Sequence, residues 1–124
     1  MPSGCIGNPV LLHPDDGDAA GPDTYTAPLN TNNYIHDLDG ENTIFGNGGH
    51  DCIVTGGNKD TITTLGGDDF INAGDGQNLI KAGDGNNNIT TGSSKDDITS
   101  GTGNDQINAG DGDNLIVAGA GNNN

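Results

Sequence analysis

The sequence predicts an all-β fold, a right-handed parallel solenoid with two nine-residue repeats per coil and about five coils. Isoleucine recurs at every ninth position from Ile35 to Ile116. Asn or Asp stands two residues before each of these isoleucines, and glycine usually stands four residues before it. No helix has a nine-residue period, and a short period kept over most of a chain is typical of a solenoid.

The composition limits how such repeats can be stabilised. Hydrophobic residues make up 29% and aromatic residues 3% of the 124 residues, which is too little for an ordinary layered core. The formal net charge is −15, and composition alone would predict disorder. Nucleic acid is excluded as a partner because phosphate binding needs a basic surface. Cations are the natural partners.

Residues 1–32 form the first segment, which carries all five prolines and no nine-residue period. We expect it to be irregular, since proline fixes φ and removes a hydrogen-bond donor. Its acidic run Asp15–Asp18 lacks the spaced ligands of an EF-hand and favours a solvated turn. Ile6 and the stretch Val10–Leu12 could instead cover the first coil as a cap.

No apolar run reaches membrane-spanning length, and no secretory signal is recognisable. The chain stops one residue before the next isoleucine is due. We therefore expect residues 33–124 to be a solenoid cut within a repeat. Either secretion uses a signal outside this sequence, or the sequence is a fragment.

Each repeat contributes one short strand centred on its isoleucine. Because side chains alternate across a strand, an inward isoleucine places its two neighbours outward, and these are mostly polar. Small residues stand two positions after the isoleucine, where the same alternation points them inward: Thr55, Thr64, Ala73, Ala82, Thr91, Ser100, Ala109 and Ala118. Successive coils should stack ~4.8 Å apart. Ten isoleucines are a thin core against the entropy of ordering such a chain, so a bound ligand is expected to help.

Three stretches carry a resemblance to a known family: Gly66–Ile71, Gly103–Ile107 and Gly49–Ile53. They resemble the glycine- and aspartate-rich nonapeptide of repeats-in-toxin (RTX, hemolysin-type calcium-binding) proteins. The resemblance implies a parallel β-roll with calcium held between turns by turn carbonyls, here near Gly49, Gly67 and Gly103, and by the carboxylate of the sixth repeat position. The matching carboxylates are Asp51, Asp60, Asp69, Asp96 and Asp105. Calcium prefers such sets of carboxylate and carbonyl oxygens.

The repeats depart from the family pattern where the sixth residue is Asn. In those turns the third residue is generally Asp, and the pairs are Asp39/Asn42, Asp75/Asn78, Asp84/Asn87 and Asp111/Asn114. One interpretation is a metal-binding carboxylate moved within the turn, so that Asp39, Asp75, Asp84 and Asp111 are ligands too. The other is an asparagine ladder that needs no metal, with these four acids solvated.

Stacked turns are eighteen residues apart, so sixth positions meet their equivalents at that spacing. Asp51 and Asp69 are the only such neighbours that are both Asp. A cation between them would meet two carboxylates and the carbonyls near Gly49 and Gly67. We therefore expect the tightest site there.

Other chemistry has little support in the sequence. The histidines His13, His36 and His50 and the cysteines Cys5 and Cys52 show no zinc-type spacing, and surface roles are favoured for them. Cys5 and Cys52 could form a disulfide or remain two thiols. No nucleophile–base set or phosphate loop is present, so we do not expect an enzyme.

Three functions remain after these exclusions. The favoured one is a calcium-binding structural module of a secreted or cell-surface protein that folds on binding calcium. The second is the C-terminal repeat region of a larger secreted enzyme, toxin or adhesin. The third, a flat-faced solenoid that binds ice or glycan, is weak because its outward column is irregular: Phe45, Thr63, Lys81, Thr99 and Val117. We expect an extracellular or cell-surface location, with calcium ions, the rest of a repeat protein or a cell-surface target as partners.

Overall fold

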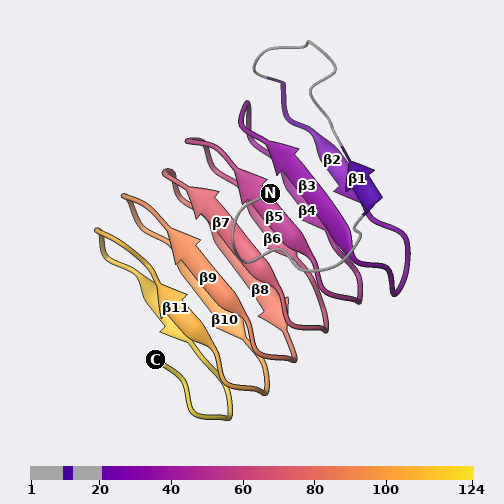
Figure 1. Ribbon diagram of the computed structural model, residues 1–124. Coiled ribbons are helices and arrows are strands. Elements are labelled where there is room, and N and C mark those ends of the chain that lie inside the picture. Colours follow the sequence, from indigo (N-terminus) through magenta and orange to yellow (C-terminus); the bar gives the residue numbers. More distant parts are fainter. Residues whose placement is uncertain (1–9, 13–20) are drawn as a thin grey trace.

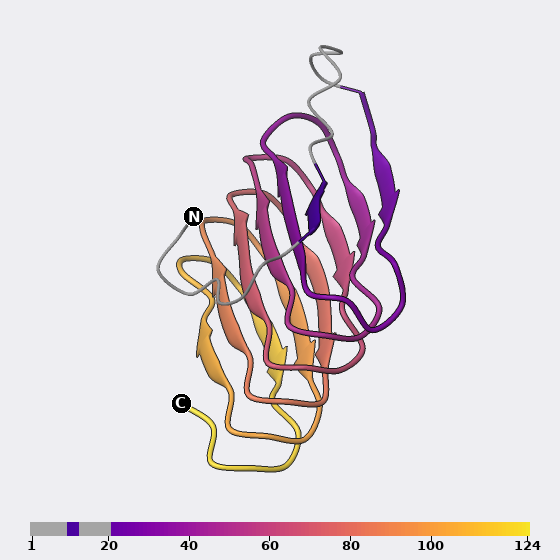
Figure 2. The ribbon, with the colours of Figure 1, turned by 45° about the vertical axis from the view of Figure 1, so that its right-hand side comes forward.

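A computed structural model describes residues 10–12 and 21–124 and confirms the all-β parallel solenoid of about five coils (Figure 1). The strands alternate along the chain between two six-stranded sheets, which lie face to face when the molecule is turned (Figure 2). Sheet A contains β1 (Val10–Leu12), β3 (Asn33–Asp37), β5 (Cys52–Thr55), β7 (Phe70–Gly74), β9 (Asn88–Thr91) and β11 (Gln106–Asn108). Sheet B contains β2 (Thr24–Thr26), β4 (Thr43–Phe45), β6 (Thr61–Thr63), β8 (Leu79–Gly83), β10 (Asp97–Ser100) and β12 (Leu115–Val117).

The isoleucines set the register of both sheets. Ile35 pairs with Ile53 and Ile53 with Ile71 in sheet A, and Ile44 pairs with Ile62 in sheet B. The eight isoleucines from Ile35 to Ile98 have no exposed surface. Ile107 is only half-buried and Ile116 is 44% exposed, because β11 and β12 each have a strand on one side only. The expectation of ten buried isoleucines was therefore wrong at the last coil.

The small residues two positions after each isoleucine point inward, as predicted. Thr55, Thr64, Ala73, Ala82, Thr91, Ser100 and Ala109 are all buried, and Ala118 in the last coil is half-buried. Cys52 is an exception among the outward positions. It is buried, and it is disulfide-bonded.

Backbones approach closely where the coils turn. Gly67 has a φ of 124°, and a Cβ there would collide with the carbonyl oxygen of Gly49 in the preceding coil. Glycine is therefore required at the fourth position of this turn by both its backbone conformation and its neighbour. The carbonyl of one turn thus faces the backbone of the next.

Parts of the first segment extend the sheets. β1 pairs with β3 and β2 pairs with β4, both in parallel. Cys5, Ile6, His13 and the acidic run Asp15–Asp18 lie outside the described residues. In the part of the chain that the structure describes, no helix is long and apolar enough to cross a membrane.

Two adjacent substitutions test the inward and outward assignment. Ile80→Asp should abolish folding, since Ile80 is fully buried and an unpaired carboxylate is costly to bury. Leu79→Asp should be far milder because Leu79 is only half-buried on the outer face. Circular dichroism of the two variants in calcium checks this. Equal loss of β signal in both would show the assignment to be wrong.

Candidate metal sites in the turns

The sixth repeat positions form two rows of side chains, one along each edge of the solenoid where the sheets connect. The first edge carries Asn33, Asp51, Asp69, Asn87, Asp105 and Asn123. The second edge carries Asn42, Asp60, Asn78, Asp96 and Asn114. All of them are buried except Asn114 and Asn123, which are half-buried in the last coil. The rows therefore lie inside the molecule although they consist of Asp and Asn.

A hydrogen-bonded ladder runs along each row. The backbone N–H of each sixth-position residue donates to Oδ1 of the residue eighteen positions later, over 2.8–3.1 Å. Asn33 N–H donates to Asp51 Oδ1, for example, and Asp51 N–H donates to Asp69 Oδ1. These bonds place Oδ1 of the nine accepting residues between two coils. They fix the remaining side-chain atom, Oδ2 in Asp or Nδ2 in Asn, toward its own turn.

The second carboxylate oxygen of the aspartates has no such partner. Oδ2 is buried and has no partner with hydrogen-bond geometry among the described residues in Asp51, Asp60, Asp69, Asp96 and Asp105. The nearby hydroxyls of Thr55 and Thr64 donate instead to the carbonyl oxygens of Ala73 and Ala82. A buried carboxylate oxygen without a donor or a cation costs several kcal/mol. These oxygens therefore indicate where a cation would be bound.

Burial changes the acidity of these groups. It raises the pKa of the Asp51 carboxyl to about 6 and that of Asp69 to about 7, only partly offset by the hydrogen bonds that they accept. The neighbouring Asp51 charge adds to the rise at Asp69. At Asp60 burial also raises the pKa, and the charges of Asp37 and Glu41 contribute. In each case the ionised form is destabilised by the structure.

The calcium-free fold should therefore depend on pH. A carboxyl whose pKa is raised on folding stabilises the fold below its unfolded value and loses that contribution as pH rises through the folded value. For Asp51 and Asp69 the loss falls between about pH 4 and pH 8. In metal-depleted buffer we expect more β structure at pH 5 than at pH 8 by circular dichroism.

The double variant Asp51→Asn with Asp69→Asn is the control for this prediction. It removes both carboxyls and keeps the histidines, so it should flatten the pH dependence. A wild-type signal that stays constant or rises with pH would contradict the assignment.

The third-position acids lie elsewhere. Asp75 Oδ1 accepts hydrogen bonds from the Ser93 amide and hydroxyl, at 2.8 and 2.9 Å. Asp84 Oδ1 likewise accepts from the Thr102 amide and hydroxyl, each at 2.8 Å. These bonds lower the pKa of both carboxyls, which are exposed. Asp39 and Asp111 are exposed as well, and a ligand role for all four stays a prediction.

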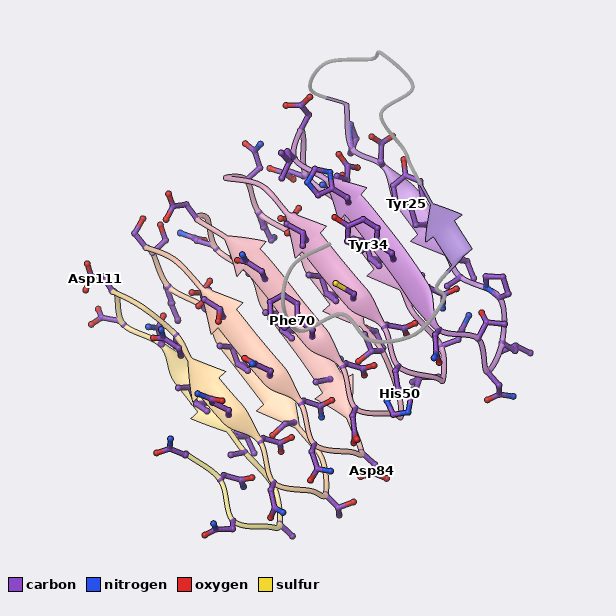
Figure 3. All side chains as sticks on the ribbon, in the orientation of Figure 1. Tyr25, Tyr34, His50, Phe70, Asp84 and Asp111 are labelled. Atoms are coloured by element: carbon purple, nitrogen blue, oxygen red, sulfur yellow. The ribbon has the colours of Figure 1, made fainter. Side chains whose placement is uncertain are left out.

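A second, outer ladder runs along the first edge at the fifth position. His50, Asp68, Asn86, Asn104 and Asn122 each donate a backbone N–H to the fifth-position side chain of the preceding coil. Figure 3 shows His50 and Asp84 on this edge and Asp111 on the opposite one. His50 Nδ1 accepts from the Asp68 amide at 3.1 Å. His50 therefore belongs to a structural ladder, in agreement with the surface role expected for it.

The residue type at the first repeat position, five residues before the sixth, correlates with the residue type at the sixth. Sequence reasoning missed this correlation. Where the sixth residue is Asp, the first is Gly46, Thr55, Thr64, Thr91 or Ser100; where it is Asn, the first is Ala73, Ala82, Ala109, Ala118, Asp37 or Pro28. The two positions are in contact, since a Cβ on Gly46 would collide with Asp51 Oδ2. Asp37 is a buried acid at this position. A comparison of the first and sixth columns of the repeats would have found the pattern.

The structure brings some of the expected ligands together and separates others. Asp51 and Asp69 are direct neighbours, as are the turns at Gly49 and Gly67. Asp105 lies between Asn87 and Asn123, and Asn78 separates Asp60 from Asp96. Among the described residues, no group of three His, Cys, Asp or Glu side chains could hold a metal ion. A cation here would therefore need backbone and amide oxygens as well, which suits calcium.

Comparison with known families gives one result. The RTX calcium-binding nonapeptide repeat matches in four copies, at residues 29–62, 54–89, 63–98 and 90–124. No curated protein and no solved structure matches the chain significantly. The four copies together span residues 29–124, which include the solenoid strands β3 to β12, and the chain belongs to the RTX calcium-binding nonapeptide repeat family.

Proposed function

We propose that this RTX β-roll is a structural module of a secreted or cell-surface protein, and that its coils fold when calcium binds at the turns ending in Asp. The observation that carries this is the buried Oδ2 of each sixth-position Asp, which has no hydrogen-bond partner among the described residues. Calcium would supply the missing positive charge, with turn carbonyls near Gly49, Gly67 and Gly103 as further ligands. The family is typical of secreted proteins, and extracellular calcium would be available there.

A structural role fits the way the turns are used. The acids of the repeats lie in turns and ladders between coils, and no catalytic domain is evident in the described part of the chain. A cation between two coils would neutralise carboxylates that otherwise repel, in a chain of net charge −15. Binding and folding would thus be one equilibrium.

Calcium binding measured by isothermal titration calorimetry tests this proposal. One variant replaces Asp51, Asp60, Asp69, Asp96 and Asp105 by Asn and should bind no calcium tightly. A matched control neutralises five acids outside the third and sixth positions: Asp23, Glu41, Asp68, Asp97 and Asp113. It should keep the wild-type stoichiometry. A wild-type chain that binds no calcium, or equal losses in both variants, would overturn the proposal.

A further inference from the structure

The turns that end in Asn are closed by their own side chain. Asn87 Nδ2 donates to the carbonyl oxygens of Gly83 and Gly85, each at 3.2 Å. Asn78 Nδ2 lies 3.4 and 3.3 Å from the carbonyl oxygens of Ala73 and Gly74. The last two turns repeat the arrangement, with Asn114 Nδ2 donating to Ala109 O and Asn123 Nδ2 to Ala118 O, both at 2.9 Å.

The ladder fixes which amide atom faces the turn. Asn87 Oδ1 accepts the backbone N–H of Asp69, and Asn78 Oδ1 accepts that of Asp60. A backbone N–H can only donate, so the oxygen must face it. Nδ2 is then left facing the turn carbonyls, which can only accept.

The aspartate turns have the same ladder, but a carboxylate takes the place of the neutral amide. Asp69 and Asp105 use Oδ1 in the ladder as the asparagines do, which directs Oδ2 to the position that Nδ2 holds in an Asn turn. Oδ2 has no hydrogen to offer the carbonyls. Oδ2 of these aspartates is therefore without a partner at the place where Nδ2 of an asparagine donates to the turn carbonyls.

We propose that the amides of Asn78, Asn87, Asn114 and Asn123 take the place of calcium, so that their turns close without metal. This rests on the proposed function, because it assigns calcium to the Asp turns alone. A positively polarised NH₂ group bonds the turn oxygens that a cation would otherwise bind. Four of the eleven turns thereby close without metal and alternate with turns that depend on calcium.

Two further features distinguish these turns. Their first residue is Ala in all four, and its carbonyl accepts the amide in the turns of Asn78, Asn114 and Asn123. Three of them have an acid at the third position, and in the two that have a following coil this acid accepts hydrogen bonds from it: Asp75 from Ser93 and Asp84 from Thr102. Asp75 and Asp84 therefore join coils through Oδ1, and in this proposal they are not carboxylates moved toward the metal.

The test exchanges Asp and Asn in both directions, each with an adjacent control. Asp96→Asn removes a buried acid and is compared with Asp97→Asn, which removes an exposed one. Asn87→Asp adds a buried acid and is compared with Asn88→Asp, which adds an exposed one between Phe70 and Gln106. Each pair carries the same change in charge one residue apart.

Two readouts are needed. Calorimetric stoichiometry should fall by one calcium ion in Asp96→Asn and rise by one in Asn87→Asp, with both controls at the wild-type value. In chelator, folding is driven by trimethylamine N-oxide and followed by circular dichroism. Asp96→Asn should need less of this osmolyte than Asp97→Asn, and Asn87→Asp should need more than Asn88→Asp.

The outcomes separate the two proposals. Wild-type protein that binds no calcium would refute the proposed function. The osmolyte requirements of the variants in chelator would still test whether the amides close their turns. Calcium binding with an unchanged stoichiometry in Asp96→Asn, or equal osmolyte requirements within each pair, would refute the amide closure alone.

Discussion

In excess chelator the chain is expected to lose most of its β structure, and millimolar calcium is expected to restore it. The aliphatic core is thin, since its large side chains are a single row of isoleucines on each sheet. One site held at a hundred times its dissociation constant adds ~2.7 kcal/mol. About five such sites contribute on the order of 10 kcal/mol, comparable to the whole stability of a typical domain.

Far-UV circular dichroism during a calcium titration measures this, with magnesium as the matched control ion. Magnesium is smaller and demands a stricter geometry, so it should restore little structure at the same concentration. A full β spectrum in chelator that calcium does not change would contradict the expectation. The amide-closed turns would then be sufficient to hold the fold.

Asp51→Asn and Asp69→Asn are expected to remove the tightest calcium-binding step, whereas Asp60→Asn and Asp96→Asn should leave it in place. Asp51 and Asp69 are stacked sixth-position acids, joined by the bond from the Asp51 amide to Asp69 Oδ1 at 2.8 Å. Both Oδ2 atoms are buried without a partner. A cation beside them would relieve a repulsion that the isolated acids Asp60 and Asp96 do not have within their ladder.

We expect each of the first two substitutions to weaken the tightest step by about tenfold or more, which corresponds to ~1.4 kcal/mol. Calcium titration against a competing chelator resolves steps of this size. Equal weakening by all four substitutions would show that the sites do not differ in affinity and that the stacked pair has no special role.

The fold could be predicted from the sequence because one period determines most of it. A nine-residue spacing of isoleucine places the strands β3 to β12, and alternation across a strand then assigns inward and outward positions; β1 and β2 lie before the first period and were not predicted. Two departures depend on the surroundings of a residue and not on its place in the repeat. Ile116 lies in an outermost strand, and Cys52 is buried and disulfide-bonded at a position that the pattern assigns outward.

The site could be predicted only in part. The sixth-position aspartates were recognisable, but which oxygen enters the ladder and which remains without a donor depends on how coils stack. The hydrogen-bond partners of the third-position acids also depend on how coils stack. A carboxylate at Asp84 has the right chemistry for calcium, and only the stacked coil shows that it accepts bonds from Thr102. The Asn and Asp turns differ in one side-chain atom: Nδ2 of Asn donates to the turn carbonyls, whereas Oδ2 of Asp has no donor.

A crystal structure of the calcium-loaded chain, with anomalous scattering used to locate the ions, tests the account most directly. We predict calcium beside Oδ2 of Asp51, Asp60, Asp69, Asp96 and Asp105, and none in the turns closed by the amides of Asn78, Asn87, Asn114 and Asn123. Calcium in both classes of turn alike, or bound to the outer carboxylates of Asp75 and Asp84, would contradict it.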